Sequence, residues 1–267
     1  MDYEIKLVAG HLLLVSTKLT AQDKDRVLNS VRFTQLYANA EADRFSEVSL
    51  WSSCTLKAFQ ICGWSTSYSR NIEVNVCANE YGSVPSFILD HLAVSEASLT
   101  PDQVVAVSTA LYSLEHHANA CDWLKGTAFK ETLSESPEGS RPITTMSLQV
   151  SVIEPRNQLI NFSVSCALYS ASSPSMLSRP ILGSDTEKKV TLSAVRAELD
   201  FVTYESVKGN IIDALGTDSK HPWLEIKVLV PTAMPTRYPE SIKPCATAGV
   251  SSADTPIKSV QRKGSSV

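Results

Sequence analysis

The sequence lacks the signatures of the common enzyme classes. It has only 10 glycines in 267 residues, and neither the GxGxxG nor the GxxxxGK(S/T) phosphate-binding loop occurs. The metal motif HExxH and the nucleophile motif GxSxG are absent as well. We therefore predict no catalytic, cofactor-binding or metal-binding residues, and no enzyme activity.

An excess of positive charge and long hydrophobic runs are also missing. The chain has 24 basic and 28 acidic residues, a net charge of −4, so we expect no nucleic acid bound through a basic arm. No apolar run approaches the ~18 residues of a transmembrane helix. Asp2, Glu4 and Lys6 precede the first apolar run, and no cleavage site for a secretory signal follows it. These features predict an intracellular protein, or a virion protein if the source is viral.

The six cysteines do not form a recognisable framework. None occurs as CxxC, and several fall at positions that suggest burial in strands or helices. We expect free thiols in a reducing compartment, although the even number leaves disulfides open.

The most informative stretch is the one from Met146 to Tyr169. Apolar residues alternate with Ser and Gln in its first half, and with Ser and Ala in its second half. Because successive side chains of a strand point to opposite faces, each half has one apolar and one small polar face. Glu154 to Gln158 lies between the halves, and Pro155 belongs in a turn because it cannot donate to a ladder. The stretch predicts an antiparallel hairpin.

The polar face of this hairpin has three interpretations. A solvated sheet face is the one we favour. The face could instead contact a second copy of the chain, or the hairpin could span a membrane as part of a β-pore. For spanning, about 9–11 residues are needed, and the first run is slightly short.

The rest of the chain predicts an α+β fold with mainly antiparallel strands, one long helix, shorter helices and an extended C-terminal tail. Thr100, Pro101 and Gln103 form a capping signature for the long helix, which should run to about Lys125 before Gly126. Strands are expected at 3–8, 12–16, 48–62, 71–78, 189–202 and 223–230, with a turn at 63–67. Other helices are expected at 21–44, 86–93 and 204–215.

A few residues could carry chemistry, but none has the required partners. The densest ligand-capable group is His116, His117, Cys121 and Asp122, with His91 as a further ligand; we favour an exposed His pair and a core cysteine. Cys62, Cys77 or Cys121 could pair with His91 or His221 as a nucleophile. Ser65 is interpreted as a turn serine, and Trp51, Trp64, Tyr68 and Tyr81 as core and rim aromatics.

From Pro231 the composition changes to Pro, Ser and Thr with few large apolar residues. We predict one domain over 1–230, with a possible sub-boundary near 134–142, and a tail over 231–267. The favoured function is a structural subunit that assembles with copies of itself into a virion, tail or shell, its tail contacting a neighbour. The alternatives are a pore-forming protein that uses the hairpin 146–169, and an enzyme with an unrecognised Cys/His site. No small-molecule ligand is expected, and a membrane is a partner only for the pore.

Overall fold

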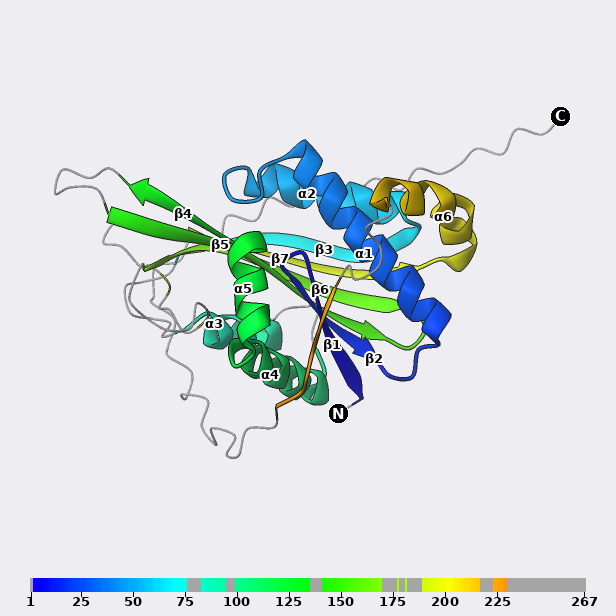
Figure 1. The fold of residues 1–267 in the computed structure, drawn as a ribbon, viewed down its shortest axis with the longest axis horizontal. Coiled ribbons are helices and arrows are strands. Elements are labelled where there is room, and N and C mark those ends of the chain that lie inside the picture. The colour runs from blue at the N-terminus through cyan, green and yellow to red at the C-terminus, as the bar shows by residue number, and fades with distance from the viewer. Residues whose placement is uncertain are drawn as a thin grey trace.

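The computed structural model describes residues 2–75, 83–94, 99–134, 141–169, 177, 181, 189–216 and 223–229. Helices and strands alternate irregularly along this part of the chain (Figure 1). The strands are β1 Tyr3–Val8, β2 His11–Ser16, β3 Trp64–Asn75, β4 Phe129–Ser134, β5 Arg141–Glu154, β6 Gln158–Tyr169, β7 Lys189–Leu199 and β8 Leu224–Ile226. The helices are α1 Ala21–Glu41, α2 Val48–Ile61, α3 Val84–Val94, α4 Pro101–Glu115, α5 Ala118–Thr127 and α6 Phe201–Leu215.

One sheet contains all eight of these strands. Its order is β3-β7-β6-β5-β2-β1-β8, and β4 pairs with β5 beyond that path. Every pairing is antiparallel except the one between β2 and β5, where Leu12 is in register with Val150. The predicted α+β fold with a mainly antiparallel sheet is therefore confirmed.

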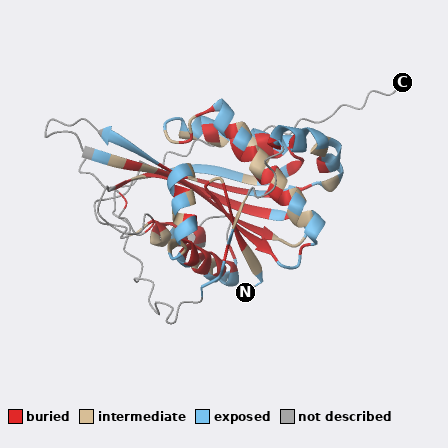
Figure 2. Ribbon diagram, viewed as in Figure 1, coloured by how far each residue is buried: buried red, intermediate tan, exposed pale blue. Residues whose placement is uncertain are grey.

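Helices cover both faces of the sheet (Figure 1). On one face, α1, α2 and α6 pack on strand residues such as Val15 and Leu159. On the other, α3, α4 and α5 pack on residues such as Leu148 and Val164. The central strands are consequently buried along most of their length (Figure 2).

The hairpin predicted from Met146 to Tyr169 is present as β5 and β6. The two strands pair from Ile143 with Tyr169 to Glu154 with Gln158. Pro155 lies in the turn, where Arg156 and Asn157 both have positive φ angles of 69° and 58°. Two successive positive φ values are typical of a tight hairpin turn, because their twist matches that of the strands.

The segment 48–62, which we predicted as a central strand, is instead the helix α2. Its buried residues are Trp51, Thr55, Ala58 and Phe59, and Cys62 is buried directly after the helix. Their spacing of three and four is that of one helical face. The apolar residues of this segment fit both the period of two of a strand and the period of 3.6 of a helix. The strand interpretation was the wrong one. The turn expected at 63–67 is also wrong, because β3 begins at Trp64.

The long helix expected from Thr100 to about Lys125 is two helices, α4 and α5. The predicted capping box is present, since the Thr100 side chain accepts from Gln103 N and the Gln103 side chain accepts from Thr100 N. His116 ends α4, and His117 is extended, with φ −109° and ψ 101°, and caps α5. His116 and His117 interrupt the helix, and this changes which residues face the sheet. As a result, α5 buries Ala120 and Leu124 rather than the predicted Ala118 and Cys121.

The strand predicted at 71–78 is the second half of β3, which begins seven residues earlier at Trp64, and residues 76–78 lie outside the described residues. The strand predicted at 223–230 is shorter, since β8 covers only Leu224–Ile226. The other predicted elements agree with the structure to within a few residues, including the helix capped by Thr20, whose side chain accepts from Asp23 N. Residues 135–140 and the tail 231–267 lie outside the described residues, and the domain division stays a prediction. In the described part of the chain, no helix is both long and apolar enough to span a bilayer.

Candidate functional site

The polar face of the hairpin is buried beneath the chain's own helices. We call this face the polar seam; it consists of Ser147, Gln149, Ser151, Asn161, Ser163 and Ser165, all at most 9% exposed. Our prediction of a solvated face is therefore wrong. Sequence periodicity shows that a face is polar, but it cannot show whether water or another element covers it.

Side chains from β2 and α1 partner the seam. His11 Nε2 lies 2.8 Å from Ser151 Oγ, and Ser151 Oγ donates to Asn161 Oδ1 over 2.9 Å. Gln35 Nε2 on α1 donates to Gln149 Oε1 over 2.6 Å. The pairing is incomplete, because His11 Nδ1 and Gln35 Oε1 are buried without a partner among the described residues.

Burial sets the charge state of His11. Its side chain is fully buried, and this desolvation, with a smaller effect from the positive charge of Arg44, lowers its pKa to about 3. His11 is consequently neutral at physiological pH, and protonating it would place two cations close together inside the protein.

Arg44, just after α1, contacts the polar seam through the backbone of Ser147. Its Nη1 donates to the carbonyl oxygens of Ala9 and Thr127 at 3.1 and 3.0 Å, and its Nη2 donates to that of Ser147 at 3.0 Å. The guanidinium also lies 4.6 Å from the centre of the Trp51 ring. Burial lowers its pKa to about 10, so the group stays charged at neutral pH.

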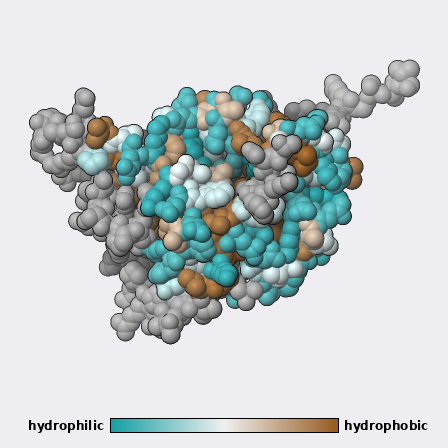
Figure 3. Space-filling model, in the orientation of Figure 1, coloured by the Kyte–Doolittle hydropathy of each residue, from teal (hydrophilic) through white to brown (hydrophobic). Residues whose placement is uncertain are grey.

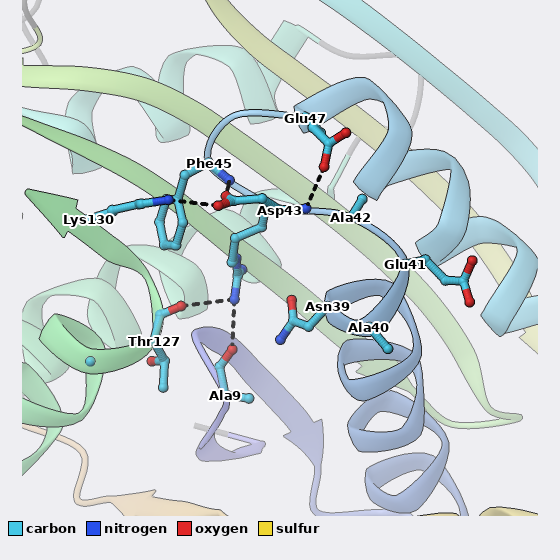
Figure 4. Close-up of a pocket in the computed structure, with 12 residues that line it drawn as sticks. Ala9, Asn39, Ala40, Glu41, Ala42, Asp43, Phe45, Glu47, Thr127 and Lys130 are labelled. Carbon is cyan, nitrogen blue, oxygen red and sulfur yellow. Dashed lines mark hydrogen bonds and ion pairs between the residues drawn. The ribbon is translucent and has the colours of Figure 1, made fainter. Parts of the chain in front are cut away.

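The hollow beside Arg44 has a volume of about 620 Å³ and carries charges of both signs. Lys130 Nζ pairs with Asp43 Oδ2 at 2.7 Å, and a Glu47 carboxylate oxygen accepts from the backbone N of Asp43 at 3.0 Å (Figure 4). These side chains satisfy one another and form no nucleophile–base arrangement. The geometry therefore indicates that this site fixes the end of α1 and the loop after it against the sheet.

A second polar contact holds the tip of the hairpin on the opposite layer. Glu154 Oε1 accepts from Gln103 Nε2 on α4 over 2.5 Å and also from the Tyr3 hydroxyl. The Tyr3 pKa is raised, mainly by burial and then by the neighbouring Glu154 carboxylate. Gln103 thus both caps α4 and ties it to the last residue of β5.

The ligand-capable residues that the sequence singled out are not gathered into one site. His116 is exposed and stacks on Tyr112 at 4.1 Å, while His117 Nδ1 accepts from Ala120 N. The Cys121 thiol is half-buried rather than in the core; it donates to the carbonyls of Leu114 and Glu115, and burial raises its pKa. No group of three potential metal ligands occurs within the described ranges.

One of the proposed cysteine–histidine pairs is divided by the sheet, and several others include a residue outside the described ranges. Burial raises the pKa of the Cys62 thiol to about 12, and this thiol packs under α1 while His91 lies on α3, across the sheet. Cys77 and His221 are not among the described residues, and neither is Tyr81. Ser65 lies in β3, Trp51 and Trp64 are buried, and Tyr68 is half-buried.

Sequence reasoning missed His11, Gln35 and Arg44. A signal for Gln35 was present, because Ser30, Thr34 and Gln35 fall on the same helical face as Val27, Val31 and Ala38. Polar residues on the buried face of a helix need polar partners, and these are supplied by the sheet only in the folded chain.

No protein-family model and no curated protein matches this chain. Among solved structures, the chain is similar to a delta-endotoxin, with a TM-score of 0.41 and 9% identity over 72% of this chain and 84% of that one. It is also similar to the Evf virulence factor, with a TM-score of 0.34 and 10% identity over 80% of this chain and 85% of that one. Similarities of this size do not transfer a function.

Proposed function

We propose that this protein acts on membranes by self-association, and that the hairpin β5–β6 supplies amphipathic strands to a pore. The observation that carries the proposal is the polar seam, a polar sheet face buried under the chain's own helices. Strands covered permanently on both faces are normally apolar on both, because burying polar groups is unfavourable. A second state in which water meets this face would account for its polarity.

The dimensions of the hairpin suit a bilayer. β5 has 14 residues and β6 has 12, and both exceed the roughly 9–11 residues that a tilted spanning strand needs. β5 begins at Arg141, earlier than the alternation in the sequence suggested. Its charged residues stand only at its two ends, Arg141 and Glu154, and β6 has none.

The two faces match the two environments of a pore. The apolar face, which packs under α3 and α4, would contact lipid (Met146, Leu148, Val150, Val152, Phe162, Val164, Cys166 and Leu168). The polar seam would line a water-filled lumen. In the folded chain this apolar face is buried, and the surface in Figure 3 is largely hydrophilic with small, separate hydrophobic areas. The helices must therefore move off the hairpin before it can enter lipid.

Self-association is required because the backbone hydrogen-bonding groups of a strand edge need partners in a membrane. Unpaired strand edges cannot lie in hydrocarbon, because each unsatisfied N–H or C=O group is costly there. One hairpin has two edges and cannot close on itself, so several copies must contribute strands to one barrel. This retains the prediction that copies of the chain are its partners.

The seam serines allow a direct test, because Ser→Cys is nearly isosteric. Ser147→Cys and Ser163→Cys are made singly in the full chain, which is then treated with a charged, membrane-impermeant thiol reagent. We expect no labelling of either new thiol in solution, because both sites are buried, and labelling when dye-loaded liposomes are present and leak. Site-resolved mass spectrometry provides the measurement.

The native Cys166, on the apolar face of β6, is the internal control, and it should stay unlabelled in both conditions. Two results would overturn the proposal. One is the absence of dye release from every vesicle composition; the other is leakage during which both new thiols remain protected.

The shell-like subunit favoured by the sequence stays a prediction. It rests on the tail 231–267, which lies outside the described residues, and on a polar face that is covered by α1. A native mass measurement without lipid separates the two functions, because a shell subunit assembles in water and a pore assembles on the membrane.

A further inference from the structure

A small cavity lies between α3 and the sheet, away from the polar seam. Its volume is about 210 Å³, with β3, β7 and β6 beneath it and α3 above it. The lining side chains are mostly apolar (Ile72, Ile88, Leu92, Phe162, Val164 and Leu192). Tyr68, Arg70, His91, Ser193 and Ala194 complete the wall.

The cavity has a simple origin in the cross-strand register. Ala194 on β7 is in register with Arg70 on β3 and with Phe162 on β6. In the next row of the same face, Leu192 stands between Ile72 and Val164. The alanine methyl fills much less space than a leucine side chain, and this difference leaves room beneath α3.

The row formed by Arg70, Ala194 and Phe162 is polar at one end and apolar at the other. Arg70 is exposed and lies on β3, the terminal strand of the sheet path, whereas Phe162 is buried on β6. Tyr68, two residues from Arg70 on the same face of β3, has a buried hydroxyl with no hydrogen-bond partner among the described residues. An unpaired buried hydroxyl is unfavourable, and an acceptor entering the cavity would relieve it.

We propose that this cavity binds a single-chain amphiphile with an anionic headgroup. The carboxylate lies at the β3 edge, where it pairs with Arg70 and accepts a hydrogen bond from Tyr68, and the hydrocarbon chain lies over Ala194 toward Phe162. The cavity holds about seven methylene-sized groups, if each takes roughly the ~30 Å³ of a water molecule. The site takes its ligand from solution, so its test is separate from that of the pore.

Calorimetry with a series of linear carboxylates from butanoate to decanoate tests the proposal on the full chain. We expect saturable one-to-one binding that strengthens about fourfold for each added methylene, the effect of removing one such group from water. The gain should stop near eight carbons, where the cavity is full. Octyltrimethylammonium, with the same tail and the opposite charge, should bind at least tenfold more weakly than octanoate.

Substitutions locate the site. Ala194→Phe fills the cavity and should weaken octanoate binding at least tenfold, and Ala194→Val, a smaller change, should weaken it by less and keep the fold. Arg70→Glu should remove the preference for the anion, whereas Arg156→Glu, an exposed charge in the hairpin turn, should leave it unchanged. The proposal is overturned if octanoate does not bind, if affinity keeps rising at the same rate from octanoate to decanoate, or if a folded Ala194 variant binds as the native chain does.

Discussion

Gln35 on α1 and Gln149 on β5, 114 residues apart, share a 2.6 Å hydrogen bond between side chains that are each 1% exposed. A polar pair therefore joins this helix to the hairpin at a point where apolar packing would be the ordinary solution. The pair links α1 to the sheet through a hydrogen bond. Under the proposed function the Gln149 amide would be hydrated once α1 moves away.

The first prediction concerns this pair. Gln35→Leu alone leaves the Gln149 amide buried and unpaired, which should lower the free energy of unfolding by about 1–3 kcal/mol. Replacing both residues with leucine removes both polar groups and should restore most of that loss. Urea unfolding of the single and double variants measures the coupling, and additive effects would contradict it. If Gln149 lines a pore, the double variant should also release less dye although it is well folded.

The second prediction is a pH dependence of stability. The pKa of His11 is about 3 in the folded chain and near 6.5 when unfolded, so the unfolded state binds the proton more readily. The stability that neutral His11 contributes is therefore complete above about pH 6.5 and is lost as the pH falls toward 3. The slope should approach roughly 1.4 kcal/mol per pH unit in that window.

The matched control for His11 uses another histidine. Urea unfolding between pH 7.5 and 4.5 should show a smaller slope for His11→Gln than for the native chain, because glutamine does not titrate. His116→Gln, at an exposed position, should keep the native slope. Equal slopes for the His11 variant and the native chain would exclude His11 as the titrating group.

The third prediction concerns Arg44. Arg44→Met removes the donor to three backbone carbonyls, so the buried oxygen of Ser147 and the partly buried oxygens of Ala9 and Thr127 lose this hydrogen bond. We expect a loss of about 3 kcal/mol or more in the free energy of unfolding. Lys130→Met breaks an ion pair in the same hollow, but that pair is exposed and its loss should cost about 1 kcal/mol or less. Similar losses for the two variants would show that the carbonyl contacts do not stabilise the fold.

The fourth prediction compares two glycines. Gly10 and Gly216 both have positive φ, 81° and 68°, so alanine is strained at either position. At Gly10 an added Cβ would lie 3.1 Å from Arg44 Nη1 and from the Thr127 carbonyl oxygen, whereas Gly216 faces open space. Gly10→Ala should therefore lower the thermal midpoint by more than Gly216→Ala does. Equal shifts would mean that the Arg44 side chain moves aside freely.

Local signals in the sequence predicted much of the secondary structure. The caps at Thr20 and Thr100, the alternation in β5 and β6 and the turn at Pro155 depend on neighbouring residues alone. The prediction failed at 48–62, where the same apolar residues satisfy a period of two and a helical face. It failed again at His116 and His117, where two residues leave the helix without any proline or glycine to mark the break.

The candidate site could not be assembled from the sequence, because its members are separated along the chain. His11, Gln35, Arg44, Ser151 and Asn161 come from five different segments, namely β2, α1, the loop after α1, β5 and β6. None of them matches a motif, and each is ordinary by itself. They form a site only because the folded chain buries them against one another.

By itself, then, the sequence determined that the hairpin is amphipathic, because the side-chain alternation of a strand is fixed by backbone geometry. Only the tertiary structure decided what covers its polar side. α1 and Arg44 lie over that face. Whether a face of a strand is exposed to solvent or buried depends on elements that are distant in sequence and close in space.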